Sequence, residues 1–336
     1  MKLTYSQIKD FALGAESVVE TELGISFYRF TEEELELYST TQFADKSYAT
    51  AGIRLAFETD ASALTLGVNI AFGGSSRSYF AIEVFQDGKR AGILKNYPDG
   101  ATFNEMRTGC SDGDFEKTFP LSPGKKTIEI YLPWSVTPTI TELTLNNATF
   151  ANKIHRERIL LMYGDSITHG YDAALPSQSY SNRFADALGM QVYNKAIGGE
   201  VFFPALAECE PTLAPEVITV AYGTNDWNKT DPATFEQNSR AFLQALAERH
   251  PQAKIFVFTP IWRKDHGLEK PFSSFSAIAE HLTAVAQELP NGIVLKGIDF
   301  VPHDAKFYAD RRLHPNDEGF DHYFNNLYAV IKNHLE

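Results

Sequence analysis

The sequence predicts an N-terminal antiparallel β-sandwich followed by a C-terminal three-layer α/β/α sandwich with a five-stranded, mainly parallel sheet. Two observations carry this prediction. Apolar residues in the first half recur at every second position, as in residues 64–70 (LTLGVNI), which is typical of half-buried antiparallel strands. After about residue 158, short apolar runs alternate with segments of helical spacing, which indicates βαβ units. We therefore expect a β-domain over residues 1–155 and an α/β domain over residues 156–336.

Turn signals support the sandwich. Residues 80–85 and 91–94 flank Asp87-Gly88, which is typical of a two-residue hairpin turn. Residues 73–76 and 122–125 are rich in Gly, Ser and Pro and predict further turns. Several short strands separated in this way indicate a jelly-roll-like sandwich. No catalytic set of residues is visible in this half.

The composition excludes some partners. The chain has 43 Asp and Glu against 30 Lys and Arg, a formal net charge of −13, which disfavours nucleic acid and an anionic membrane surface. No apolar run approaches the roughly 18 residues of a membrane helix, and residues 1–10 lack the apolar core of a secretory signal. Cys110 and Cys209 are too far apart to suggest a metal or disulfide framework. We expect a cytoplasmic protein and leave its oligomeric state open.

The second half predicts five buried strands separated mostly by helices. A helical pattern over residues 177–188 ends before Gly189, another opens at Asp231-Pro232, and the last follows Asn316. The strands are predicted at residues 159–163, 192–197, 217–222, 255–258 and 293–298.

Polar motifs follow four of these strands. Ser166 comes after the first, Gly199 after the second, Asn225 after the third, and His314 between the fifth and the last helix. In a parallel sheet these positions share one edge, where they offer a hydroxyl, backbone N–H groups, a carboxamide and an imidazole. Such groups serve acyl transfer as nucleophile, oxyanion donors and general base. Ser166 alone would equally fit an N-cap on a phosphate-binding turn, and its potential partners favour the nucleophile.

Residues 158–336 resemble the SGNH (GDSL-type) hydrolases, which have a flavodoxin-like fold. The resemblance rests on four motifs in the order of that family, each weak alone. It implies that Ser166 is the nucleophile and His314 its general base. It also implies an oxyanion hole made by the N–H groups of Ser166 and Gly199 and the side-chain amide of Asn225. The motifs are Gly164-Asp165-Ser166, Gly199, Gly223-Thr224-Asn225-Asp226 and His314-Pro315-Asn316.

One position departs from the family. The acid that orients the histidine usually lies three residues before it, and Arg311 occupies that position. Asp310 would reach His314 if the chain bulged by one residue, and this is the candidate we favour. Asp304 and a backbone carbonyl are the alternatives.

Four further residues are candidates for the substrate pocket. Asp165 and His169 flank the serine turn, although His169 fits a structural role equally well. Trp227 and Trp262 follow the third and fourth strands, where an aromatic ring would contact substrate or pack beneath a loop. No His-Glu-x-x-His or paired-cysteine pattern is present, so neither a metal nor another cofactor is expected.

These observations predict a serine esterase. An N-terminal β-sandwich before such a domain resembles two-domain carbohydrate deacetylases and related acyltransferases. The resemblance implies a short-chain, acetyl-type ester of a small molecule or oligosaccharide, with the β-domain helping to shape the site. An acyltransferase uses the same acyl-enzyme and stays an alternative. A carbohydrate-binding protein with an inert second domain is an alternative of another class.

Overall fold

The computed structural model describes residues 1–270 and 272–335. These residues form two compact units. The first unit comprises Met1–Leu35, Ala44–Glu157 and Leu175–Ser177. The second comprises Glu36–Phe43, Arg158–Ala174 and the described residues from Gln178 onward.

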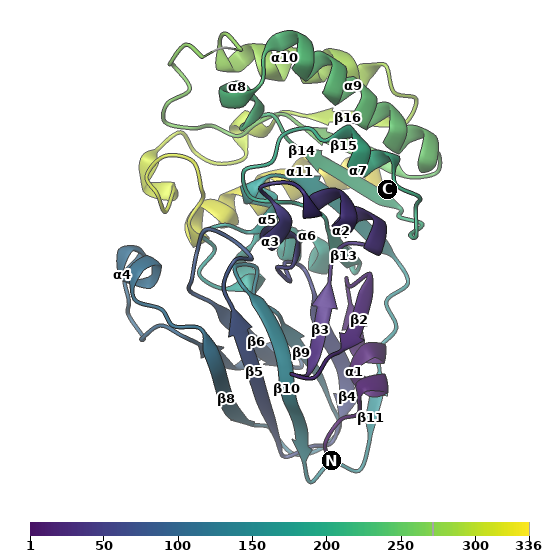
Figure 1. The fold of residues 1–336 in the computed structure, drawn as a ribbon, viewed down its shortest axis with the longest axis vertical. Coiled ribbons are helices and arrows are strands. Elements are labelled where there is room, and N and C mark those ends of the chain that lie inside the picture. Colours follow the sequence, from purple (N-terminus) through teal and green to yellow (C-terminus); the bar gives the residue numbers. More distant parts are fainter. Residues whose placement is uncertain (271, 336) are drawn as a thin grey trace. The chain divides into compact units, whose positions relative to one another are not determined.

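The first unit contains two antiparallel sheets (Figure 1). In spatial order, one sheet consists of β1 (Ala12–Leu13), β4 (Arg54–Thr59), β9 (Lys126–Tyr131), β6 (Ala81–Gln86) and β7 (Lys89–Lys95), and β11 (Ala151–Lys153) also pairs with β4. The other consists of β2 (Ser17–Glu20), β3 (Ile25–Tyr28), β10 (Thr137–Asn146), β5 (Ala63–Ala71) and β8 (Gly113–Pro120).

One apolar core joins the two sheets. Alternate side chains of β5, such as Leu64, Leu66 and Val68, are fully buried in it, together with side chains from β4 and β9 of the other sheet. The hairpin between β6 and β7 turns at Asp87 (φ +48°) and Gly88 (φ +73°), the left-handed conformations that a type I′ turn requires. The predicted antiparallel sandwich is confirmed.

Short helices of this unit went unpredicted. The helix α1 (Tyr5–Phe11) has a capping box, in which Thr4 and Gln7 bond each other's backbone N–H, and it buries Ile8 and Phe11 on one side. Its Thr-x-x-Gln signal was readable in the sequence. The others are α3 (Ala44–Ser47) and α4 (Phe103–Thr108), whereas α2 (Glu32–Ser39) includes residues of both units.

The second unit is built on a five-stranded sheet in which every pairing is parallel. This confirms the predicted α/β sandwich. In spatial order the strands are β13 (Gln191–Asn194), β12 (Ile159–Gly164), β14 (Val217–Ala221), β15 (Lys254–Phe258) and β16 (Gly292–Leu295).

Helices cover both faces of this sheet. Figure 1 shows α9 and α10 on one side of it and α6 and α11 on the other. The predicted signals cap these helices: the side chain of Asp231 accepts two N–H groups at the start of α9, and Gly189 ends α6 in the left-handed conformation. The helical segments of this unit are α5 (Ser166–His169), α6 (Tyr180–Leu188), α7 (Pro204–Glu208), α8 (Asp226–Lys229), α9 (Pro232–Arg249), α10 (Phe275–Gln287), η2 (Gly297–Asp299), η3 (Ala305–Phe307) and α11 (Asp317–Leu335). The short η1 (Pro176–Gln178) includes residues of both units.

The strand order creates a switch point. From β12 the chain crosses to β13 on one side and then returns to β14 on the other. Open parallel sheets bind ligands at the carboxyl ends of strands that flank such a reversal. Within the described residues, no helix has the length and apolar character needed to cross a membrane.

Candidate active site

Ser166 begins the single-turn helix α5, directly after β12. The Asp165 side chain caps this helix, because its Oδ1 accepts the N–H of Ile167 at 2.9 Å. Gly170 ends the helix with φ +109°. A Cβ on Gly164 would lie 2.4 Å from Oγ1 of Thr168, so only glycine fits before the turn. The serine is therefore held from both sides, and it is 5% exposed.

His314 lies against the serine. Its Nε2 is 2.9 Å from Oγ of Ser166, the geometry of a general base and its nucleophile. The Tyr171 ring stacks on the imidazole, with 5.6 Å between ring centroids and 29° between planes. The carbonyl of His314 accepts the N–H of Ala309 at 2.8 Å, which closes the loop that carries the histidine. Sequence reasoning missed Tyr171.

Asp310 lies behind His314. Its Oδ2 is 2.8 Å from Nδ1 of the imidazole, and its Oδ1 accepts the N–H groups of Arg312, Leu313 and His314 at 2.9, 2.8 and 3.1 Å. Burial raises the pKa of the Asp310 carboxyl, but the hydrogen bond and charge of His314 and the backbone N–H groups outweigh it. The net pKa is well below its ordinary value.

The backbone conformation of Arg311 makes this contact possible. Its φ of +58° lies in the left-handed region, and this turn supplies the extra residue between acid and histidine. Asp304 instead caps η3, accepting the N–H of Lys306 at 3.0 Å. Of the acids considered from the sequence, Asp310 is the one that contacts the imidazole.

A second carboxylate also faces the histidine. Oδ2 of Asp172 lies 3.6 Å from Nδ1 of His314, and its side chain is fully buried. Sequence reasoning missed this residue, because nothing in the local pattern marks it. In the described part of the chain, Asp172, Asp310 and His314 are the group whose potential metal-ligand atoms lie within 4.8 Å of one another. The same Nδ1 already faces Asp310 at hydrogen-bond distance, so the cluster is suited to orienting the imidazole.

The three predicted oxyanion donors come from the carboxyl ends of the neighbouring strands β13, β12 and β14. Gly199 has φ +93°, a conformation that favours glycine. The Asn225 amide donates to the carbonyl of Glu200 at 3.0 Å, so it lies against the Gly199 turn. Within the described residues, the N–H groups of Ser166 and Gly199 have no hydrogen-bond acceptor.

Buried acids hold these turns. Glu200 accepts the hydroxyls of Tyr38 and Tyr222 at 2.6 and 2.8 Å. Asp226 accepts the N–H groups of Phe202 and Gly223 at 3.2 and 3.1 Å, which ties the turn after β14 to the segment after Gly199. Burial raises the pKa of Asp226 to about 7.

Two of the four pocket candidates have structural contacts. Asp165 is 2% exposed and serves as the helix cap, and burial raises its pKa to about 6. His169 is 1% exposed, and its Nδ1 accepts the N–H of Gly198 at 3.3 Å. That bond anchors the turn that contains Gly199.

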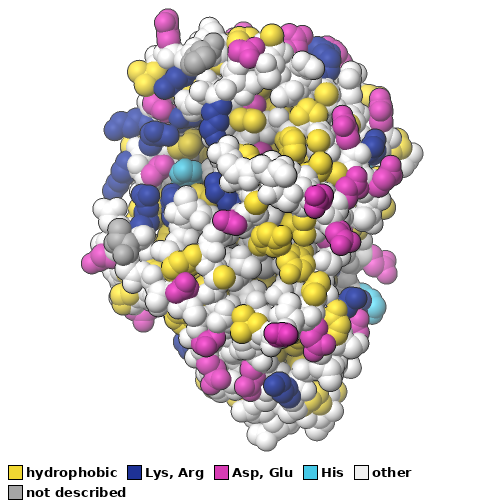
Figure 2. All heavy atoms as spheres, viewed as in Figure 1, with side chains coloured by type: hydrophobic (Ala, Val, Ile, Leu, Met, Phe, Trp, Pro, Cys, Tyr) yellow, Lys and Arg dark blue, Asp and Glu magenta, His cyan; other side chains and the backbone are white. Residues whose placement is uncertain are grey.

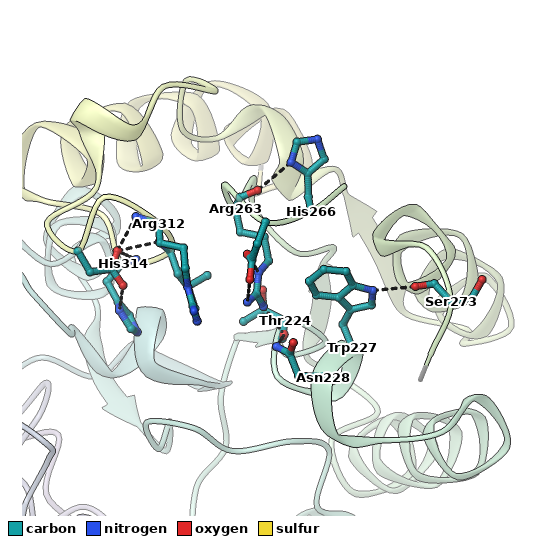
Figure 3. A network of polar contacts seen from close by, with 11 residues as sticks. Thr224, Trp227, Asn228, Arg263, His266, Ser273, Arg312 and His314 are labelled. Atoms are coloured by element: carbon teal, nitrogen blue, oxygen red, sulfur yellow. Dashed lines mark hydrogen bonds and ion pairs between the residues drawn. The ribbon is translucent and has the colours of Figure 1, made fainter. Parts of the chain in front are cut away.

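The two tryptophans predicted to line the pocket, Trp227 and Trp262, differ in their surroundings. Trp227 is completely buried, its Nε1 donates to the carbonyl of Ser273 at 3.0 Å, and the Arg263 guanidinium lies 4.9 Å from its ring (Figure 3). It therefore packs beneath the loops in this structure. Trp262 stacks on His303, with 5.9 Å between centroids, and lines a cavity of about 640 Å³.

Residues 162–322 match the sequence model of the GDSL-like Lipase/Acylhydrolase family. This part of the chain is a GDSL-like lipase/acylhydrolase domain. The matched residues include Ser166, Gly199, Asn225 and His314. No curated protein matches the sequence at a significant level.

Solved structures share the fold of the GDSL-like domain and of the first unit. A salicylyl-acyltransferase from a tetracycline biosynthetic pathway has a TM-score of 0.80 at 21% identity, and the match covers 96% of this chain and 94% of that one. A GDSL-like lipase from Bacteroides ovatus has a TM-score of 0.77 at 17% identity, with 100% and 98% covered. A family two carbohydrate esterase from Cellvibrio japonicus has a TM-score of 0.65 at 17% identity, with 100% and 99% covered.

Proposed function

We propose that this protein is a serine esterase that hydrolyses short-chain, acetyl-type esters of a carbohydrate or glycoside. One observation carries the proposal: Ser166, His314 and Asp310 form a continuous hydrogen-bonded chain, with distances of 2.9 and 2.8 Å. In this proposal residues 156–336 are the catalytic domain and residues 1–155 help to shape the substrate site.

Acylation begins at the serine. Nε2 of His314 takes the hydroxyl proton of Ser166 while Oγ attacks the ester carbonyl carbon, and the carbonyl π electrons move to oxygen. The N–H groups of Ser166 and Gly199 and the amide of Asn225 bind that oxyanion. The carbon–oxygen bond to the alcohol then breaks, and the imidazolium gives its proton to the departing oxygen. Asp310 stays ionised throughout and stabilises the imidazolium.

Deacylation repeats these steps with water. His314 removes a proton from water, whose oxygen attacks the acyl-enzyme carbonyl. When the second tetrahedral intermediate collapses, Oγ of Ser166 leaves and regains its proton from His314, and the carboxylic acid departs. In this proposal the donors lie on turns that hydrogen bonds already fix, such as those of Gly198 with His169 and of Asn225 with Glu200, so the oxyanion is stabilised without large rearrangement.

The substrate class is supported by neighbours of the same fold. Among the similar structures are family two carbohydrate esterases and an acetyl xylan esterase from Butyrivibrio proteoclasticus, which has a TM-score of 0.64 at 14% identity. The half-buried position of His314 also leaves its ring accessible beside the serine.

The test is hydrolysis of 4-nitrophenyl acetate and of acetylated sugars by the full chain. We expect the acetate to react faster than long-chain esters, and Ser166→Ala to abolish turnover. Ser177→Ala, at a serine outside the proposed site, is the matched control. Activity that survives Ser166→Ala would contradict the proposal.

An acyltransferase is the second candidate, because the salicylyl-acyltransferase noted above has the same fold with a TM-score of 0.80. The acyl-enzyme would then react with an alcohol in place of water. Partitioning of a labelled acetyl group between water and added sugars separates the two. If most of the labelled acetyl group goes to the sugar even when the sugar is dilute, the result favours the acyltransferase.

A further inference from the structure

The loop that carries His314 is basic, in contrast to the whole chain. Segments 262–270 and 305–314 contain six Lys and Arg but three Asp and Glu, whereas the net charge of the chain is −13. The N–H of Lys264 donates to the carbonyl of Arg312 at 2.9 Å, which joins the two segments. On the face seen in Figure 2, dark blue side chains gather over the region of this loop.

Arg312 is the member of this group nearest the proposed catalytic residues. Its N–H and that of His314 bond the same oxygen of Asp310. In Figure 3 its side chain leaves the loop in the same direction as that of His314. The side chain is exposed, and within the described residues its guanidinium makes no hydrogen bond or ion pair. Burial raises the pKa of Asp265, but the hydrogen bonds and charge of Arg263, followed by the charge of Arg312, outweigh it and lower the pKa. That carboxylate is already bound by both Nε and Nη2 of Arg263.

The other arginines of the second unit are engaged. The exceptions are Arg311 and Arg312, whose guanidinium groups have no hydrogen-bonded or ion-paired partner in the described residues. Only Leu313 separates these two arginines from His314 in the sequence. Arginine is weakly hydrated and forms bidentate bonds to carboxylate and phosphate, so two unpaired guanidinium groups beside a site are suited to an anion. The engaged residues are Arg158 with Glu216, Arg183 with Asp321, Arg240 with Glu288, Arg249 with the carbonyls of Glu208 and Cys209, and Arg263 with Asp265.

We infer that Arg312 binds an anionic group, a carboxylate, sulfate or phosphate, on the alcohol part of the substrate. This inference rests on the proposed esterase function. The imidazole must meet the departing oxygen to protonate it, so the alcohol lies on the His314 side of the ester. A guanidinium on the same loop is therefore placed to contact that half of the substrate, while the oxyanion donors contact the carbonyl. The local positive charge also offsets the repulsion of an anion by the acidic chain.

The test compares a charged ester with its neutral counterpart. The substrates are 4-acetoxybenzoate and its methyl ester, which carry the same acetyl group, and the readout is the ratio of their kcat/KM values. Dividing the ratio of a variant by that of the wild type cancels the intrinsic reactivities of the two esters. The variants are Arg312→Gln, Arg312→Lys and the control Lys306→Gln, which removes a charge from the same loop next to Phe307.

We expect Arg312→Gln to lower this ratio about tenfold, because it removes the charged donor of the hydrogen bond to the anion. Arg312→Lys should recover part of the loss, and Lys306→Gln should stay within about twofold. A fall of less than fivefold in Arg312→Gln, or an equal fall in Lys306→Gln, overturns the inference. If the wild type still removes the acetyl group of the neutral methyl ester and Ser166→Ala does not, the esterase proposal stands even when the Arg312 inference fails. The two proposals therefore fail separately.

Discussion

At the level of single residues, the two carboxylates around His314 differ in what they offer the imidazole. Asp310 bonds Nδ1 at 2.8 Å and is itself held by three backbone N–H groups, whereas Asp172 lies 3.6 Å away and is fully buried. An acid held by so many donors keeps its orientation and its charge. We therefore assign the orienting role to Asp310 as a proposal.

The first prediction separates the candidate acids. Asp310→Asn should lower kcat by about 10³ to 10⁴, because an amide NH₂ facing Nδ1 favours the wrong tautomer of the imidazole. Asp304→Asn, in the same loop but remote from the ring, should change kcat less than about twofold. Steady-state kinetics on 4-nitrophenyl acetate measures both. A fall below tenfold for Asp310→Asn would exclude Asp310 as the orienting acid.

The second prediction concerns Gly198. A Cβ there would lie 2.4 Å from the Tyr171 ring, which stacks on His314. Gly198→Ala should thus displace Tyr171 and lower kcat by about tenfold, while overpacking costs about 1–3 kcal/mol of stability. In a double-mutant cycle, adding Gly198→Ala to Tyr171→Ala should cost little more than Tyr171→Ala alone. Additive losses would show that the glycine acts by another route.

At the level of elements, two aspartates cap helices of very different length. Asp165 caps the single turn of α5, and Asp231 caps the 18-residue helix α9. Both accept backbone N–H groups that the helix leaves without partners. Only the first cap also determines the position of Ser166.

The third prediction uses these caps as a matched pair. Asp165→Ala and Asp231→Ala should each lower the free energy of unfolding, because each removes the side-chain acceptor of N–H groups at the start of its helix. Only Asp165→Ala should also lower kcat, and Asp165→Asn should restore much of it because the amide oxygen still accepts the N–H of Ile167. Urea unfolding and kinetics on the same preparations measure both effects. Equal activity in the two alanine variants would contradict a positioning role for Asp165.

At the level of the whole molecule, buried acids make stability depend on pH. Burial raises the pKa of Asp226 to about 7 from 3.8, so the folded state holds this proton more tightly than the unfolded state. Stability from this group is thus fully present below about pH 4 and falls as the pH rises toward 7. The shift corresponds to about 4 kcal/mol, at 1.36 kcal/mol per pH unit.

The fourth prediction isolates this effect. The free energy of unfolding of the wild type minus that of Asp226→Asn should fall as the pH rises from 4 to 8, since only the wild type must ionise a buried carboxyl. Urea unfolding followed by the intrinsic fluorescence of the three tryptophans measures it. Asp231→Asn is the control, because Asp231 is exposed and hydrogen bonds lower its pKa. A pH-independent difference for Asp226→Asn would refute the assignment.

The local sequence was sufficient to predict the antiparallel sandwich, the parallel sheet and the edge where the polar motifs meet. Residues 159–163 are uniformly apolar, so they had to be buried on both faces as a parallel strand, and Ser166 had to follow at its carboxyl end. The same reasoning applied to Gly199 and Asn225. It failed for helices such as α7 and α10, where no clear start signal was recognised, and for α1, whose capping box was overlooked.

The tertiary structure decided the contacts between distant residues. Only the left-handed backbone at Arg311 brings Asp310 to His314, and a φ angle of this kind in arginine leaves no trace in composition or spacing. The burial of Trp227 beneath Arg263 likewise depends on which side chains meet in space, and so does the lack of a hydrogen-bonded partner for the Arg312 guanidinium among residues 1–270 and 272–335. Periodicity reports which face of an element is buried, whereas pairing, loop conformation and charge balance around a site arise from the packing of segments far apart in the chain.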